Sequence, residues 1–164
     1  MAVWQYTIYL VPNTALAADG SLPGVTVAGG MFDLPPLTFA FSGEQLERSV
    51  ATILPPAKSW HSDLRAYGDD ARHDINIWYE NGRVRNVRIR IDLRSASPSL
   101  VGRVASLGRE MDCSFFEVSN KAVVPADEAA LVNSIKHSRP ARFASDPRGF
   151  MDSLARESPS RRPE

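Results

Sequence analysis

Five arginines crowd one short stretch of the sequence, where alternation of apolar and charged residues predicts a strand face. They are Arg83, Arg85, Arg88, Arg90 and Arg94. A sheet face of this kind, with aromatic neighbours, can bind RNA through phosphate contacts and base stacking. Alternatively, the arginines form ion pairs with the nearby carboxylates of Asp74, Glu80 and Asp92 on a solvated face. The formal net charge of +0 favours ion pairing. Arginine is also an enriched anchor in protein interfaces, so an acidic protein partner is a third interpretation.

A second polar group precedes these arginines. Asp69, Asp70, His73 and Asp74 bring carboxylates and an imidazole close together, and both are ligand types for divalent cations. Their spacing matches no metal-binding loop, since neither a calcium-loop glycine nor a distal glutamate is in place. We therefore interpret the segment as a polar loop that enters a strand, and we expect no metal ion and no cofactor.

Cys113 is the single cysteine and the remaining candidate nucleophile. Catalysis would require a lowered thiol pKa and a neighbouring base. The sequence places none of the three histidines, His61, His73 and His137, beside it. A free cysteine usually behaves as a small buried apolar residue, so we predict a core position and no catalytic residue. One cysteine excludes an internal disulfide and suits a reducing compartment, which favours a cytoplasmic location.

Aromatic and methionine side chains in irregular segments are candidates for partner contacts. Trp60, His61 and Tyr67 lie in the connection 57–73, and Met31 and Phe32 lie in the Gly-, Ala- and Pro-rich connection 13–36. Exposed side chains of these types suit a protein interface. They are equally suited to fold back and close the core, and the sequence leaves both interpretations open.

The segment 74–94 must position the arginines. Its two halves alternate apolar and polar residues around Asn81-Gly82, which is the pattern of a hairpin with a type I′ turn. A two-residue turn alone would place polar residues on the apolar face. We therefore predict a β-bulge near Arg85-Asn86, which restores Ile77 opposite Val87.

The remaining elements follow from local signals. Residues 3–11 alternate as a strand, Ser42 and Gln45 form a capping box that begins a helix, and Ser97-Pro98 begins a second helix. Further predicted elements are a strand over 113–118, a short edge strand over 122–124, a helix over 127–137, and a short helix opened by Asp146-Pro147 with Phe150, Met151 and Leu154 facing inward.

This order of elements predicts an α+β fold, a ferredoxin-like βαββαβ sandwich with two additional C-terminal helices. A length of 164 residues fits a single domain over 1–157, and the polar tail 158–164 is expected to be disordered. No apolar stretch has the length of a membrane span. The arginine face is expected to lie open unless the C-terminal helices cover it, and open sheet edges allow homodimerisation.

Four motifs resemble those of a family of small bacterial proteins of unassigned biochemistry. They are Tyr67-Gly68-Asp69, Gly82-Arg83-Val84, the strand from Arg90 to Arg94, and Ser138 to Pro147, and the resemblance extends over residues 63–154. Such proteins are found beside secreted bacterial toxins, and several look like immunity proteins. The resemblance implies stoichiometric binding of a cognate toxin rather than turnover of a substrate.

We therefore interpret the chain as a protein that neutralises a toxin by occluding its active site. Acidic loops suit a basic active site, because complementary charge speeds association. The expected contact residues are Trp60, His61, Tyr67, Asp69, Asp70, Arg88 and Arg90. The alternative is an RNA- or nucleotide-binding domain that uses the arginine face and shows salt-dependent binding.

Overall fold

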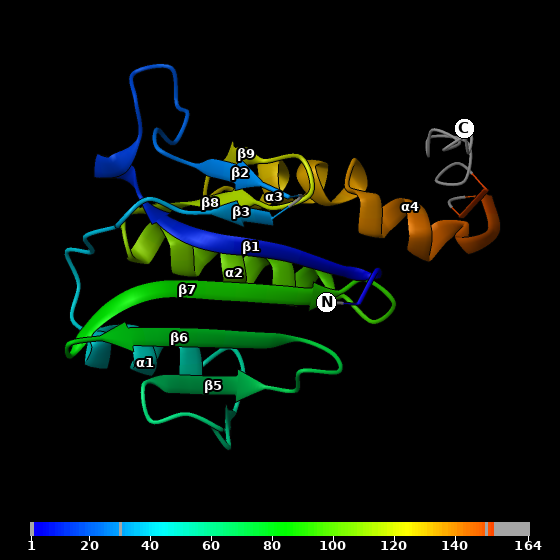
Figure 1. The fold of residues 1–164 in the computed structure, drawn as a ribbon. Coiled ribbons are helices and arrows are strands. Elements are labelled where there is room, and N and C mark those ends of the chain that lie inside the picture. The colour runs from blue at the N-terminus through cyan, green and yellow to red at the C-terminus, as the bar shows by residue number, and fades with distance from the viewer. Residues whose placement is uncertain (1, 30, 150, 153–164) are drawn as a thin grey trace, which may run out of the picture.

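One antiparallel sheet of seven strands dominates the computed structural model, which describes residues 2–29, 31–149 and 151–152 (Figure 1). The strand order is β4-β5-β6-β7-β1-β8-β9. The strands are β1 (Gln5–Pro12), β4 (Pro56–Ala57), β5 (Leu64–Gly68), β6 (Asp74–Glu80), β7 (Arg83–Asp92), β8 (Cys113–Glu117) and β9 (Ala122–Val124). A separate hairpin joins β2 (Thr26–Ala28) to β3 (Met31–Asp33). The helices are η1 (Asn13–Ala15), α1 (Gly43–Ala51), α2 (Pro98–Glu110), α3 (Glu128–Lys136) and α4 (Arg139–Ser145). The predicted α+β class is confirmed.

The central hairpin of β6 and β7 forms as predicted. Asn81 and Gly82 have φ values of 51° and 73°, the left-handed conformation that a type I′ turn requires at both central positions. Ile77 lies opposite Val87. Trp78 pairs with Asn86 and Tyr79 with Val84, so Arg85 is the extra residue of a β-bulge. The bulge keeps the apolar side chains of both strands on one face.

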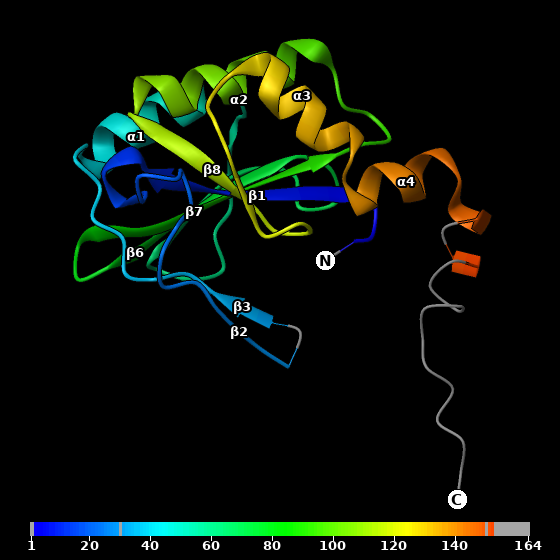
Figure 2. The ribbon, with the colours of Figure 1, turned by 90° about the horizontal axis from the view of Figure 1, so that it is seen from above.

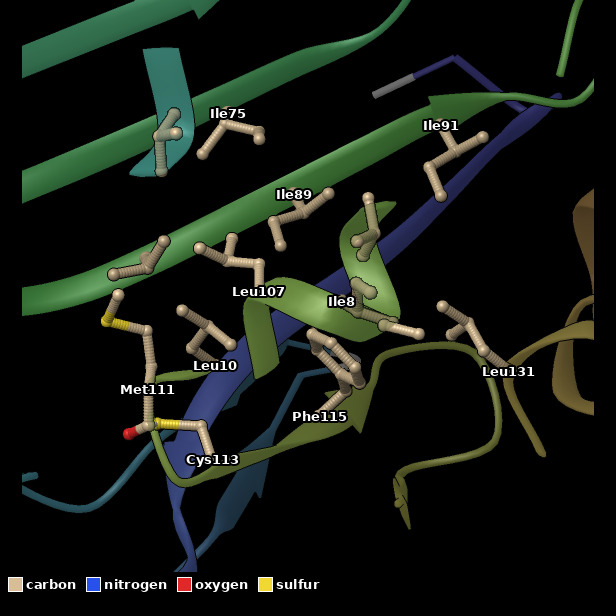
Figure 3. Packing of buried hydrophobic residues seen from close by; sticks show 14 of the residues in the cluster. Ile8, Leu10, Ile75, Ile89, Ile91, Leu107, Met111, Cys113, Phe115 and Leu131 are labelled. Carbon is tan, nitrogen blue, oxygen red and sulfur yellow. The ribbon is translucent and has the colours of Figure 1, made fainter. Parts of the chain in front are cut away.

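Helices α1 and α2 cover that apolar face (Figure 2). Alternate residues of β1 point into it, and Tyr6, Ile8 and Leu10 are fully buried there. Figure 3 shows Ile8 and Leu10 among side chains from β6, β7, β8, α2 and α3. Burial of each large apolar side chain stabilises the fold by about 1.5–3 kcal/mol. The helices begin where their caps predict, because the Ser42 hydroxyl accepts from the Gln45 amide at 3.1 Å and the Ser97 hydroxyl from the Leu100 amide at 3.2 Å.

The opposite face of the sheet, which we call the far face, is only half covered. The connection that follows β1 folds back over β1, β8 and β9, where Val11, Leu22 and Phe116 form a second apolar cluster. The β2–β3 hairpin belongs to this cover and lies on the side opposite the helices (Figure 2). The connection after β1 does not extend over the half of the far face formed by β5, β6 and β7, as far as the described residues show, and we call this half the open half. The C-terminal helices lie elsewhere, with α3 against α2.

The connection 57–73 is more regular than the sequence indicates. Strand β5 lies within it and β4 at its start, and the two extend the sheet beyond the edge of the predicted hairpin. The prediction of an irregular segment was wrong because pairing with β6 orders five residues whose own alternation is too short to signal a strand.

The C-terminal prediction needs two corrections. Helix α4 (Arg139–Ser145) was not predicted; it lies before the predicted helix at Asp146-Pro147 and has the Ser138 hydroxyl as its cap. Residues 147–149 are helical, and the Asp146 carboxylate accepts from the Gly149 amide at 3.0 Å as expected of a cap. Met151 does not face inward, since it is 55% exposed. Phe150, Leu154 and the tail 158–164 lie outside the described residues. No helix among those that are described is both long and apolar enough to cross a membrane.

Candidate binding groove on the open half of the sheet

Polar side chains from three neighbouring strands form the floor of the open half. Arg88 and Arg90 of β7 alternate with Ile89, which is buried on the helix side, so the two guanidinium groups point to the far face. Cross-strand pairing sets their neighbours in two rows. These rows are Tyr9, Arg88 and Asn76, and Thr7, Arg90 and Asp74.

Arg90 is committed to an ion pair with Asp74. Its Nε donates to Asp74 Oδ1 at 2.7 Å, and its Nη2 donates to Asp74 Oδ2. The two side chains are only 13% and 4% exposed. The hydrogen bonds to Asp74 raise the pKa of the Arg90 guanidinium. This bidentate ion pair fixes both side chains and leaves Arg90 few N–H donors for a ligand.

Arg88 has no carboxylate partner among the described residues. Its Nη2 donates to the Asn76 oxygen at 2.7 Å in the amide orientation that satisfies both ends of that side chain. It also hydrogen-bonds to the Tyr9 phenol, which opposes the rise that burial causes in the phenol pKa. Its Nε is buried without a hydrogen-bond partner in the described part of the chain. Arg88 therefore carries a positive charge that neutral groups hold in place.

Two other arginines of the stretch form the ion pairs that the sequence suggested. Arg94 Nη2 lies 2.8 Å from Asp92 Oδ2, and Arg85 Nε lies 3.6 Å from Glu80 Oε2. The first hydrogen bond, together with charge, lowers the pKa of the Asp92 carboxyl, although burial opposes it. Together with Arg90, these pairs explain much of the charged face as structural.

An aromatic cluster stands at one end of the floor. Trp60, His61 and Trp78 approach one another with ring centroids 5.4–5.9 Å apart. His61 Nδ1 accepts a hydrogen bond from the Asp63 amide at 3.0 Å, which holds its ring in place. Trp60 is 79% exposed, the highest value among the large apolar side chains that the structure describes. The segment before β5 therefore exposes the indole of Trp60 to solvent, and the rings of His61 and Trp78 pack against it.

A tight loop stands at the other end and carries Asp69 and Asp70. Gly68 enters it with a φ of 81°, and a Cβ atom there would collide with the His73 carbonyl oxygen. The Asp69 carboxylate accepts from the Ala71 amide at 2.9 Å, and Gln5 Nε2 donates to the Asp70 carbonyl at 3.1 Å. These bonds fix the backbone and leave the Asp70 carboxylate at the surface.

Two of the four candidate metal ligands, Asp74 and His73, are engaged in other contacts. Asp74 holds Arg90, and His73 Nδ1 accepts a hydrogen bond from the Asp92 amide at 3.0 Å. Within the described residues, no three side chains of the ligand types come together as a metal site.

Between the aromatic cluster and the acidic loop lies a hollow of about 470 Å³, which we call the groove. Its charged lining consists of three cationic and three anionic side chains, so it is formally neutral. They are Lys58, Arg88, Arg90, Asp69, Asp70 and Asp74. Ala57, Leu64 and Ala66 add an apolar wall. The groove is therefore suited to a ligand of mixed polarity.

The structure brings together most of the predicted contact residues. Trp60, Asp69, Asp70, Arg88 and Arg90 line the groove, and His61 supports Trp60 beside it. The seventh residue, Tyr67, also lines the groove, but the expectation that it is exposed was wrong.

Tyr67 is not an exposed contact residue. It borders the groove but is only 6% exposed, because β5 turns its ring toward the helix side, opposite Ile75. Asn76 lines the groove and Trp78 belongs to the aromatic cluster beside it, although neither was among the seven expected contact residues. Both alternate with the apolar residues of β6, so the hairpin register could have placed them beside Arg88.

Cys113 lies in the core as predicted. It is 1% exposed, and burial, together with the charge of Asp112, raises the pKa of its thiol to about 12. The thiol therefore stays protonated at neutral pH and is a poor nucleophile.

Comparison of the chain with models of known protein families, with curated proteins and with solved structures found no match. The geometry of the groove is thus the basis for a functional proposal.

Proposed function

We propose that this protein binds another protein through the groove, and that it neutralises a cognate toxin by stoichiometric binding rather than by catalysis. The exposed Trp60 is the observation that carries the proposal. Trp60 is 79% exposed. Removal of its apolar surface from water by a partner would be favourable, because the transfer of apolar surface out of water lowers the free energy. Tryptophan is also enriched among the residues that dominate binding energy in protein interfaces.

The charge of the groove supports a protein partner over a nucleic acid. Its cationic and anionic side chains are equal in number, and Arg90 is already neutralised by Asp74. Binding of a phosphate backbone depends on several uncompensated lysines and arginines. A protein surface, which mixes apolar, acidic and basic groups, matches the groove better.

The toxin as partner follows from the resemblance of residues 63–154 to proteins found beside secreted toxins. A cytoplasmic location is part of this proposal, and the free, buried Cys113 supports it. We also propose that the core of the fold is ferredoxin-like. The order β6-β7-β1-β8, with α1 between β1 and β6 in the chain and α2 between β7 and β8, supports this assignment.

The proposal is tested by affinity capture with the full-length tagged chain from a lysate of its native cells, with and without nuclease. We expect one protein in stoichiometric amount that survives nuclease treatment. Trp60→Ala should weaken its binding at least about 30-fold, which corresponds to the loss expected of a central interface residue. Co-expression of the chain should then protect cells from the captured protein.

Met151→Ala is the matched control, because Met151 is another exposed apolar residue, 55% exposed and outside the groove. It should leave capture unchanged. Equal binding by the Trp60 and Met151 variants would rule out the groove. Loss of the partner after nuclease would show that the contact runs through nucleic acid.

A second candidate function is binding of RNA or a nucleotide on the same face. The observation that favours it is that Arg88, which has no carboxylate partner within the described residues, lines the same groove as the exposed Trp60. This alternative predicts affinity that falls steeply with salt and that Arg88→Ala and Arg90→Ala both weaken.

A further inference from the structure

We infer that the groove receives an acidic side chain, an aspartate or glutamate of the protein partner, which pairs with Arg88. This inference rests on the proposed function and specifies the chemistry of the partner at one point. It concerns Arg88 alone, because the neighbouring arginine on the same face is already paired.

The contrast between Arg88 and Arg90 is the starting point. Both belong to β7, point to the far face and line the groove. The charge of Arg90 is balanced by the Asp74 carboxylate, which accepts two hydrogen bonds from the guanidinium. Among the residues that the structure describes, the hydrogen-bond partners of Arg88 are neutral groups, the Asn76 amide and the Tyr9 phenol. Of the two, Arg88 is the guanidinium to which the described part of the chain offers no anionic partner.

The position of Arg88 means that an anion supplied by a partner would contribute strongly to binding affinity. The side chain is half-buried, with its Nε shielded from water and without a hydrogen-bond partner in the described residues. Charge-assisted hydrogen bonds are roughly twice as strong as neutral ones, and partial burial reduces their screening by solvent. Asn76 and Tyr9 also hold the guanidinium in place, so a partner loses little additional side-chain entropy on binding it.

A carboxylate fits this site better than a phosphate. Asp69 and Asp70 line the same groove, whereas Asp74 is already paired with Arg90, so a doubly charged phosphate would meet two like charges there. A singly charged carboxylate meets less repulsion and matches the planar fork of arginine. Apolar surface lies beside Arg88 in the groove, because the exposed Trp60 and the wall of Ala57, Leu64 and Ala66 line the same hollow. The occupant we expect is thus a segment with one acidic residue and apolar neighbours.

The experiment is selection of peptides from a random displayed library on the purified full-length chain. We expect enriched sequences with aspartate or glutamate at one fixed position and apolar residues around it. Selection on Arg88→Gln should lose the acidic preference, and selection on Arg88→Glu should replace it with lysine or arginine. Arg83→Glu is the matched control, since Arg83 is an exposed arginine at the turn of the same hairpin, and it should leave the preference unchanged.

Affinity of the best acidic peptide provides a second measurement. Its neutral form, with asparagine or glutamine at the fixed position, should bind at least about tenfold more weakly to the unsubstituted chain and equally well to Arg88→Gln. The Arg88 Nε–H signal in NMR spectra should shift on addition of the acidic peptide. Circular dichroism of Arg88→Gln checks that this variant folds.

Two results would overturn the inference. Enriched peptides without an acidic preference would show that Arg88 does not select the partner, and tighter binding of adenosine monophosphate than of the best peptide would assign Arg88 to phosphate. Neither result affects capture of a protein through Trp60, which tests the proposed function separately. Failure of that capture would instead overturn the proposed function itself.

Discussion

Asp74 shows how one carboxylate determines which arginine of the far face is structural. It is 4% exposed and accepts both hydrogen bonds of Arg90, so neither charge is left buried alone. Removal of one member of such a pair is costly because the other remains unsolvated and unpaired. The pair therefore fixes the register of β6 and β7 at the floor of the groove.

We predict that Asp74→Asn lowers the free energy of unfolding by about 3 kcal/mol. Glu80→Gln is the control, since it disrupts the ion pair between Glu80 and Arg85. The side chain of Glu80 is 69% exposed and that of Arg85 is 35% exposed. Exposed pairs contribute little, so this variant should change stability by less than about 0.5 kcal/mol. Urea unfolding followed by circular dichroism measures both. Equal losses in the two variants would contradict the structural role of Asp74.

The thiol of Cys113 should be inert in the folded protein. Burial keeps reagents in the solvent away from the sulfur, and the raised pKa, about 12, keeps the thiol protonated. We expect labelling by iodoacetamide at pH 8 to proceed only as fast as the protein unfolds, and to become rapid in 8 M urea, a concentration chosen as roughly sufficient to unfold a domain of this size. Rapid labelling without denaturant would place Cys113 at the surface and reopen the question of a nucleophilic role.

Helix α2 contains two glycines whose surroundings differ. A Cβ atom on Gly102 would meet only the end of the Glu128 side chain, at 3.2 Å, whereas one on Gly108 would lie 2.7 Å from Ala126 and 2.8 Å from Phe115. The first neighbour is flexible and the others are packed in or against the core. The same substitution should therefore have opposite effects at the two positions.

We predict that Gly102→Ala raises the free energy of unfolding by about 0.5–1 kcal/mol, because alanine is the better helix former. Gly108→Ala should lower it by about 1–3 kcal/mol through overpacking. Thermal unfolding of the two variants, measured side by side, tests the packing of α2 on β8. A gain in stability from Gly108→Ala would show that the two elements lie further apart.

Elements with strong local signals could be predicted from the sequence. Asn81-Gly82 fixed the central turn, the alternation of β6 and β7 required the bulge at Arg85, and Ser42 located the start of α1. Strands β4 and β5 could not be predicted, because their order comes from pairing with β6 rather than from their own composition. Helix α4 was missed because the sequence offers a second cap at Asp146, and both caps are used.

The candidate site could be predicted only in part, because it too depends on strand pairing that local composition does not signal. The exposed indole of Trp60 and the arginines of β7 were identifiable by residue type. The loss of Tyr67 to the core follows from the unpredicted strand β5. The difference between Arg88 and Arg90 depends on which one Asp74 faces across the sheet, and that depends on the register.

At the scale of the whole molecule, alkaline pH should destabilise the fold. Burial raises the pKa of the Tyr6 and Tyr79 phenols above the ordinary value of 10.0, and that of the Cys113 thiol above 9.0. The folded state thus keeps protons that the unfolded chain releases, so stability is full below about pH 9 and falls as pH rises further. Each such group contributes a slope of up to about 1.4 kcal/mol per pH unit.

We expect the urea midpoint to be constant from pH 7 to about pH 8.5 and then to decrease up to pH 11. Tyr6→Phe removes one ionisable group together with its hydrogen bond to Ser134, so it should be less stable at pH 7 but lose less on alkalinisation. A midpoint that stays level to pH 11 would show that these groups titrate equally in both states.

The two edges of the large sheet have a consequence for how the molecule can assemble. Strand β4 has only two residues, and its Pro56 has no amide hydrogen to donate. Strand β9 has three residues and is followed by Pro125. Short edges interrupted by proline are poor templates for further strands. Concentrated solutions should therefore resist fibre growth, and another chain can dock far more readily on a face of this molecule than along its rim.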